Sequence, residues 1–153
     1  DDISDLFVRE LGSAPTREPE ELTMIARRAL RKKYITADIG ITGANFAIAE
    51  TGMISITENE GNARLTAALP KTMITLLGIE KILPRLADLA LFLPMLATAG
   101  AGQTLTGYNT MYGGPRQPGE CDGPEEYHVV LLDNRRTELL ADPEQRDALP
   151  AIR

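Results

Sequence analysis

The stretch ITGANFAIAETGMISITENEGNARL, residues 41–65, decides how this chain folds, because it places a β-hairpin signal between polar clusters. Apolar residues dominate 45–49 and 53–57, and this spacing predicts two antiparallel strands. The turn ETG at 50–52 joins them, and its glycine supplies a positive φ at little steric cost. A second polar cluster at 58–62 follows at once. These polar residues form either ordinary turns or the rim of a ligand site.

Strand-type and helix-type segments continue on both sides of the hairpin. Four further strands are predicted, over 38–42, 73–77, 104–112 and 127–132. Four helices are predicted, over 1–11, from 19 to about 33, over 84–97, and over 137–149 with an interruption near Pro143. This order favours an α/β fold, a mixed sheet covered by helices.

Three of these segments carry more specific expectations. The 84–97 helix is apolar nearly all round, so we expect it to be buried, with Pro94 ending or kinking it. Residues 99–102 have the composition of a small-residue linker. The apolar run at 129–132 is typical of a strand that is buried on both faces.

Size and composition fit a single ordinary domain of 153 residues. The net charge of -6 argues against nucleic-acid binding, which needs a basic face. The one basic cluster, residues 27–33, lies at a predicted helix end, where it complements the helix dipole; partner binding is the alternative. No apolar run reaches the roughly 18 residues of a membrane span, and no secretory signal is visible.

Cysteine usage limits the redox chemistry that the chain can perform. Cys121 is the single cysteine, so an internal disulfide and a four-thiolate metal site are both excluded. This usage fits a reducing compartment. The chain also lacks a starting methionine, and we expect it to be an excised piece of a longer protein.

Glu50 is the first candidate for chemistry. It stands at a strand-to-turn corner beside Thr51 and Gly52. A carboxylate held there could act as a nucleophile, a general base or a ligand clamp. The alternative is a turn acid that faces water.

The polar cluster after the hairpin is the second candidate, since it offers carboxylates, amides and a flexible glycine. Asn side chains both donate and accept, which suits hydroxy-acids or phosphates. The alternative is a turn in which Asn side chains bond the local backbone. A lysine before the 73–77 strand could add positive charge. The candidate ligand-binding residues are Gly43, Asn45, Thr51, Gly52, Asn59, Glu60, Gly61, Asn62 and Lys71.

Two other polar residues carry weaker signals. Arg116 lies in the Gly- and Pro-rich loop 113–123, where backbone could approach a ligand. His128 is the one histidine, and its strand neighbours favour a structural role. With one His and one Cys a zinc site would need mostly carboxylates, so no metal site is expected.

Several blocks of the sequence resemble the lactate-utilization iron–sulfur subunit family, whose members carry a LUD domain. The likeness runs nearly end to end. The blocks are ADIGITGANFAIAETG at 37–52, NEGNAR at 59–64, LPKT at 69–72, GIEK at 78–81, GGPR at 113–116 and HVVLLDN at 128–134.

The resemblance implies a fold of the sugar-isomerase and CoA-transferase type. It implies that the full protein joins partner subunits that oxidise L-lactate to pyruvate in the bacterial cytoplasm. It also implies 4Fe–4S clusters in the full-length protein, held by cysteines that begin just after the position of Arg153. None of those cysteines is present here, so no cofactor is expected in this fragment.

The resemblance further implies that residues 1–153 are the C-terminal part of one LUD domain, with further strands upstream. An incomplete sheet exposes an edge or an apolar face, so we expect this fragment to form a homo-oligomer. The leading hypothesis is a non-redox domain that positions a small carboxylate or phosphate ligand, or a partner subunit. The alternatives are a pure subunit-interaction module and a CoA- or acyl-transferring enzyme with Glu50 as nucleophile. The fragment alone is expected to be inactive in lactate oxidation.

Overall fold

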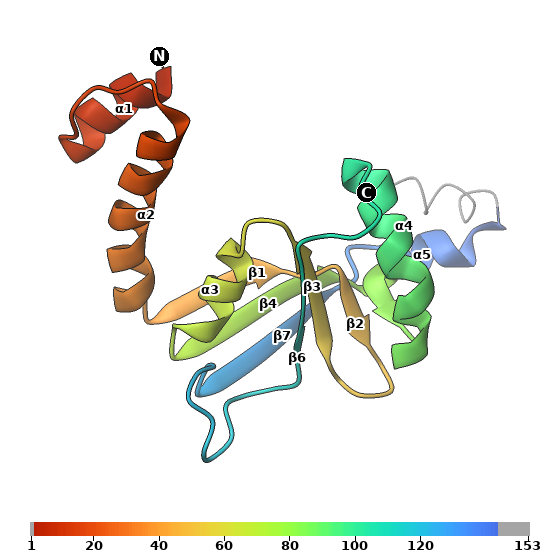
Figure 1. Ribbon diagram of the computed structural model, residues 1–153. Helices are drawn as coiled ribbons and strands as arrows, with labels where there is room; N and C mark the ends of the chain where they lie inside the picture. The colour runs from red at the N-terminus through yellow and green to blue at the C-terminus, as the bar shows by residue number, and fades with distance from the viewer. Residues whose placement is uncertain (1, 144–153) are drawn as a thin grey trace. The chain divides into compact units, whose positions relative to one another are not determined.

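The computed structural model describes residues 2–143 (Figure 1). The chain divides into two compact units, residues 1–38 and residues from Ile39 onward, and each is described by itself. The last part of the helix expected over 137–149 lies outside the described residues. None of the described helices is long and apolar enough to cross a membrane.

The first unit is a pair of helices, α1 (Asp2–Leu11) and α2 (Pro19–Thr36). Gly12, with φ of 65°, ends α1, and Pro19 opens α2 where a missing N–H is tolerated. The Thr16 N–H donates to the buried Ser4 Oγ at 3.1 Å, which fixes the connection between the helices. Both predicted helices are confirmed.

The second unit contains a three-stranded parallel sheet in the order β1-β4-β7. Its strands are β1 (Ile39–Gly43), β4 (Thr72–Gly78) and β7 (Glu126–Leu132), which lie side by side in Figure 1. Gly40 pairs with Met73, and Met73 with Tyr127. All three strands therefore end at one edge, which we call the carboxyl edge.

A four-stranded mixed sheet forms the other half of this unit, in the order β5-β2-β3-β6. Its strands are β2 (Phe46–Ile48), β3 (Ile54–Glu58), β5 (Ile82–Leu83) and β6 (Tyr108–Tyr112). The pairing of β2 with β3 is antiparallel, as the hairpin prediction required, whereas β2 and β5 are parallel. The α/β class with a mixed sheet is confirmed, although the strands divide between two sheets.

Helices and 3-10 turns lie between the strands of the second unit, and one further helix follows β7. They are α3 (Asn62–Ala68), the 3-10 turns η1 (Ile79–Lys81) and η2 (Leu86–Asp88), α4 (Leu89–Ala101) and α5 (Arg136–Ala141). Helix α3 packs against β1 (Figure 1), and a Cβ on Gly40 would overlap the backbone carbonyl oxygen of Thr66. Glycine at position 40 thus lets the helix approach the sheet closely.

The linker expected at 99–102 is wrong, because α4 continues to Ala101 and ends at Gly102 with φ of 64°. Pro94 lies inside this helix and does not end it. The expectation of a buried helix is also wrong. Leu89 and Ala97 are buried, but Leu91 is 62% exposed and Met95 is 53% exposed. Only one side of α4 packs against the described residues.

The core lies between the two sheets and α3. Its largest cluster contains Ala44, Ala47, Ile54, Ile56, Ala67, Met73 and Leu77. The prediction that β7 is buried on both faces is wrong: Val129 is 39% exposed and Leu131 is 49% exposed. Val130 and Leu132, which point to the other face, are 39% and 45% exposed, so the described residues bury neither face of this edge strand.

Candidate functional site

The predicted rim is not one surface in the structure. The turn at 50–52 lies at one end of β3 and the cluster at 59–62 at the other. A five-residue strand spans roughly 13 Å from first to last Cα. The described residues therefore do not bring Glu50 together with Asn59 and Asn62, and ligand binding by these residues stays a prediction.

Glu50 holds a neighbouring connection in place. Its carboxylate accepts the Leu86 N–H at 2.9 Å, and its own N–H donates to the Pro84 carbonyl at 3.1 Å. Glu50 is exposed. This single contact organises the start of η2, whereas a nucleophile would need a more enclosed carboxylate. Catalysis by Glu50 stays a prediction without geometric support.

Thr51 and Gly52 complete the hairpin turn. The Thr51 hydroxyl accepts the Met53 N–H at 3.2 Å, and the Gly52 N–H donates to the Ile48 carbonyl at 2.8 Å. Gly52 has φ of 72°, in the left-handed region that favours glycine. These contacts explain why the sequence turns here, and ligand binding by either residue stays a prediction.

The cluster at 58–62 opens helix α3. Both Glu58 carboxylate oxygens accept backbone N–H groups, from Ala63 and from Arg64, each at 2.8 Å. These groups would otherwise lack partners at the helix start. Gly61 has φ of 79°, and Asn62 accepts the Ala63 N–H through its own side chain at 2.8 Å. The sequence feature that could have indicated this helix start is Glu58, a carboxylate that precedes Ala63 by five residues.

Asn59 and Glu60 lie between the strand and this helix, and both are exposed. The Asn59 side-chain oxygen accepts the Gly107 N–H at 2.9 Å, which ties the cluster to the segment before β6. Asn62 bonds the local backbone, as the alternative interpretation expected, whereas Asn59 bonds a backbone group 48 residues away along the chain.

Gly43 and Asn45 lie at the carboxyl edge, where β1 ends. The Asn45 side-chain oxygen accepts the Thr57 N–H at 2.7 Å, so the side-chain nitrogen retains its donors for another group. Lys71 instead precedes β4, at the opposite edge of the parallel sheet. Its backbone carbonyl accepts the N–H groups of Glu125 and Glu126 at 2.7 and 3.0 Å. Lys71 therefore cannot supply charge to Gly43 and Asn45.

The structure brings a different lysine to the carboxyl edge. The Lys81 ammonium donates to the Ala44 carbonyl at 3.2 Å, so a positive charge lies directly over the end of β1. An ammonium has three donors, and this contact uses one. Open α/β sheets bind ligands at the carboxyl ends of their strands. The sequence feature that could have indicated this position is Lys81, which follows the end of β4 by three residues. It was not grouped with Gly43 because the two are far apart along the chain.

Residues 133–137, which follow β7, reach the same edge. The Asp133 carboxylate accepts both the hydroxyl and the N–H of Thr137, at 2.6 and 2.9 Å. These two bonds hold the pKa of Asp133 below its usual range, because they favour the ionised form. Asn134 and Arg135 have φ of 44° and 64°, a strained pair for side-chain-bearing residues.

Polar side chains also occupy shielded positions on the strands of both sheets. The Asn109 amide donates to the hydroxyls of Ser55 and Thr57, each at 2.9 Å. Burial raises the pKa of Tyr112 and of Tyr127, whose hydroxyl lies 3.3 Å from Thr75 Oγ1. Both tyrosines stay neutral near pH 7. Among the described residues the Tyr127 hydroxyl has Thr75 as its partner, whereas the buried Tyr112 hydroxyl has none.

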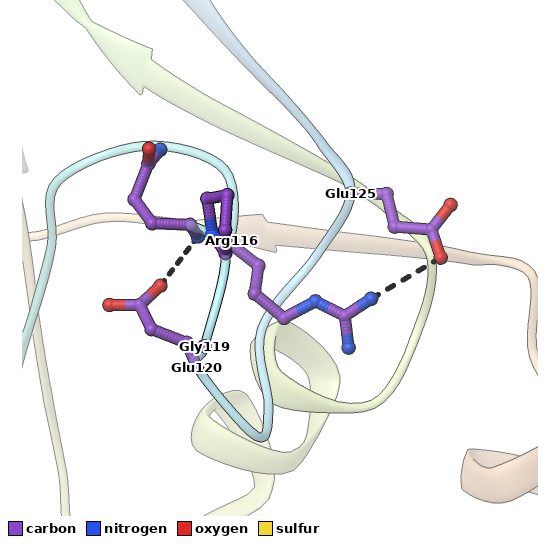
Figure 2. Close-up of a pocket in the computed structure, with 6 residues that line it drawn as sticks. Arg116, Gly119, Glu120 and Glu125 are labelled. Atoms are coloured by element: carbon purple, nitrogen blue, oxygen red, sulfur yellow. Dashed lines mark hydrogen bonds and ion pairs between the residues drawn. The ribbon is translucent and has the colours of Figure 1, made fainter.

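A surface hollow of about 490 Å³ lies in the loop between β6 and β7, lined by Arg116, Gln117, Pro118, Gly119, Glu120 and Glu125. Figure 2 shows the Arg116 guanidinium reaching toward Glu125, whose oxygen lies 3.5 Å away. One cation stands against two carboxylates, so the lining disfavours an anion. The Arg116 N–H donates to the Pro124 carbonyl at 2.7 Å, which closes the neck of this loop.

Metal and cluster chemistry finds no support in this part of the chain. Residues 2–143 contain no group of three or more His, Cys, Asp and Glu side chains that could hold a metal ion. Cys121 is exposed, and it is the one thiol of the sequence. A 4Fe–4S cluster is held by four thiolates, so these residues do not fit one. His128 lies in β7, where its ring approaches Glu126 at 3.6 Å.

Comparison with known proteins gives the chain its family. A LUD domain model matches residues 2–132. "Lactate utilization protein B" of Bacillus velezensis is 50% identical over 151 residues, which cover 99% of this chain and 32% of that protein. The protein of the same name from Bacillus subtilis is 49% identical over 151 residues, covering 99% and 31%. The chain thus spans about a third of the length of these relatives.

A solved structure resembles the chain more distantly. The DUF162 family protein from Deinococcus radiodurans aligns with a TM-score of 0.49 and 21% identity, covering 65% of this chain and 56% of that one. The family model is more extensive, because it spans α1 through the last residue of β7. The chain belongs to the LUD domain family.

Proposed function

We propose that this chain is the LUD domain region of a lactate-utilization protein and that it binds a small carboxylate at the carboxyl edge of its parallel sheet. The name and the roughly 50% identity of its relatives support the first part. The second part is supported by one observation: the Lys81 ammonium lies 3.2 Å from the Ala44 carbonyl, between Gly43 and Asn45.

The chemistry of this position fits an anion with a neighbouring hydroxyl or keto group. Lys81 supplies charge, and Asn45 keeps amide donors beyond the bond that its oxygen makes with Thr57. Gly43 carries no side chain that would block the approach of a ligand to the strand end. Lactate and pyruvate are the smallest ligands of this class, and a phosphate group is the competing one.

Redox chemistry belongs elsewhere in this proposal. The single thiol of the chain cannot hold a 4Fe–4S cluster, so oxidation of lactate to pyruvate would take place on other parts of the full-length protein or on partner subunits. We further propose a cytoplasmic setting and the sugar-isomerase and CoA-transferase type of fold, both from the family resemblance. The enzyme alternative with Glu50 as nucleophile is not favoured, because that carboxylate is exposed.

A ligand titration with two matched lysine variants tests the proposal. Thermal unfolding of the chain is measured with lactate, pyruvate, phosphate and CoA. A ligand at about 100 times its dissociation constant adds roughly 2.7 kcal/mol to the free energy of unfolding. We expect lactate or pyruvate to stabilise the wild type and Lys71→Gln, and to leave Lys81→Gln unchanged.

Three results would contradict this site. Loss of the effect in Lys71→Gln but not in Lys81→Gln would favour the rim first predicted from the sequence. Stabilisation by phosphate alone would change the ligand class. No stabilisation by any ligand would favour the interaction module, for which the exposed apolar side chains of the parallel sheet are the supporting observation.

A further inference from the structure

A second cation lies at the carboxyl edge, and Glu80 neutralises it. The Arg136 guanidinium lies 2.8 Å from the Glu80 carboxylate, and the two side chains are only 27% and 28% exposed. Arg136 is the first residue of α5, which follows β7. Asp133, the other carboxylate close to this arginine, bonds the N–H and the hydroxyl of Thr137 instead. Arg136 therefore depends on Glu80 for its counter-charge.

The position of the Glu80 carboxylate depends on the glycine that ends β4. A Cβ on Gly78 would overlap this carboxylate, so Glu80 folds back over the end of the central strand of the parallel sheet. Any side chain at position 78 would have to displace it. The sequence thus has a glycine at the place where the carboxylate needs room.

Lys81, by contrast, has no counter-charge. Its ammonium donates to the Ala44 carbonyl over the end of β1, and within residues 2–143 it forms no ion pair with a carboxylate. The ends of β1 and β7 are two strand spacings apart, or about 10 Å. Because Glu80 lies over β4, between these two strands, its ion pair brings the Arg136 guanidinium inside this span.

We propose, on the basis of the carboxylate site proposed above, that Glu80 determines the charge of the ligand: by neutralising Arg136, it restricts the carboxyl edge to monoanions. The one free ammonium, that of Lys81, complements one carboxylate. A second carboxylate on the ligand would meet Glu80, and like charges placed together repel each other. Hydroxy- and keto-monocarboxylates such as lactate and pyruvate therefore fit this edge, whereas dicarboxylates and doubly charged phosphate do not.

A charge-removing variant tests this role of Glu80. In Glu80→Gln the side chain keeps a hydrogen-bond acceptor but loses its charge, so Arg136 becomes a second free cation with N–H donors for a second carboxylate. L-lactate and L-malate are matched probes, because malate is lactate with a carboxylate attached to its methyl carbon. Their dissociation constants are measured by NMR titration of the chain at constant ionic strength, since salt screens such contacts.

We expect Glu80→Gln to shift the ratio of the two dissociation constants toward malate by about 5-fold or more, the size of a partly shielded ion pair. A merely structural role of Glu80 would weaken both ligands alike and leave the ratio unchanged. The double variant Glu80→Gln/Arg136→Gln should return the ratio to its wild-type value. Glu125→Gln is the matched control, because it removes the carboxylate partner of Arg116 before the start of β7, at the opposite edge of the sheet; the ratio should stay unchanged.

An unchanged ratio in Glu80→Gln, with lactate binding that still depends on Lys81, would overturn the inference and leave the proposed site standing. An equal shift in Glu125→Gln would also overturn it, because the net charge of the chain would then be the cause. Absence of lactate binding in the wild type, or its persistence in Lys81→Gln, would remove the proposed site and the inference with it. If Glu80→Gln fails to fold, Gly78→Ala takes its place, since the added Cβ displaces the Glu80 carboxylate, and a shift in the same direction is expected.

Discussion

The Arg136 guanidinium lies 2.8 Å from the Glu80 carboxylate, and this ion pair joins the first residue of α5 to the segment that follows β4. Both side chains are about three-quarters shielded, with 27% and 28% exposed. The pair therefore holds the two connections at the carboxyl edge together, and Glu80 directly precedes Lys81 in the sequence.

Removal of one partner of this ion pair should destabilise the chain. We expect Arg136→Gln to lower the free energy of unfolding by roughly 1–2 kcal/mol, because the shielded Glu80 carboxylate loses its counter-charge. Arg135→Gln is the matched control: its pair with Glu138 is 81% and 64% exposed, so a change of less than about 0.5 kcal/mol is expected. Urea unfolding of both variants measures the difference, and equal losses would contradict the assignment.

Relief of backbone strain after β7 should stabilise the fold. Arg135 has φ of 64°, and the left-handed conformation costs a residue with a Cβ about 1–2 kcal/mol. We expect Arg135→Gly to raise the free energy of unfolding by roughly 0.5–1 kcal/mol after the entropy cost of glycine. Asn134→Gly should gain less, because Asn tolerates this region. A loss of stability in Arg135→Gly would show that the strain is offset by contacts of its side chain.

Replacement of two glycines by alanine should change the free energy of unfolding in opposite directions. A Cβ on Gly40 overlaps the Thr66 carbonyl oxygen, so Gly40→Ala should cost about 2 kcal/mol or more. Gly100 lies in α4, and a Cβ added there would meet no neighbouring atom within 4 Å, so Gly100→Ala should gain up to about 1 kcal/mol. Thermal unfolding distinguishes the two signs. A neutral Gly40→Ala variant would mean that α3 can move away from β1.

Asp133 should report the start of α5 through its titration. The Thr137 hydroxyl and N–H lower its pKa below the ordinary value of 3.8. The stability that it contributes is thus fully present above pH 3.8 and is lost as pH falls through the lowered pKa. In Thr137→Val the hydroxyl bond disappears, and the pKa should rise toward the ordinary value. Carboxyl NMR measures it, and an unchanged pKa would assign the effect to the backbone bond.

Local patterns predicted most elements of this fold. The hairpin over β2 and β3 followed from the alternation around Gly52, and α2 followed from Pro19 and its apolar spacing. Helix α3 was missed because its seven residues begin inside a polar cluster, and the cap supplied by Glu58 is a contact that spacing alone does not show.

The candidate site was harder to predict, because parallel pairing brings distant residues together. Because they are close in sequence, Glu50 and Asn62 were placed in one candidate ligand site, although β3 separates them in the structure. For the same reason Lys71 was expected to supply the positive charge of that site. The carboxyl edge instead joins Gly43 to Lys81, and their meeting depends on the β1-β4 register. Burial of β7 was overestimated for a similar reason, since an apolar run does not tell whether both sides of a strand have neighbours.

The neck of the loop between β6 and β7 has a practical consequence. The bond from the Arg116 N–H to the Pro124 carbonyl closes the loop at its base, and the Gly123 N–H donates to the Ala68 carbonyl at 3.2 Å. Residues 117–122 therefore form a loop whose length can change without moving either strand. Loop-closure entropy grows slowly with added residues, and exposed tips tolerate insertion. A peptide tag or a fluorescent reporter inserted beside Gly119 should therefore leave the two sheets intact, which gives a handle for following assembly of the domain inside cells.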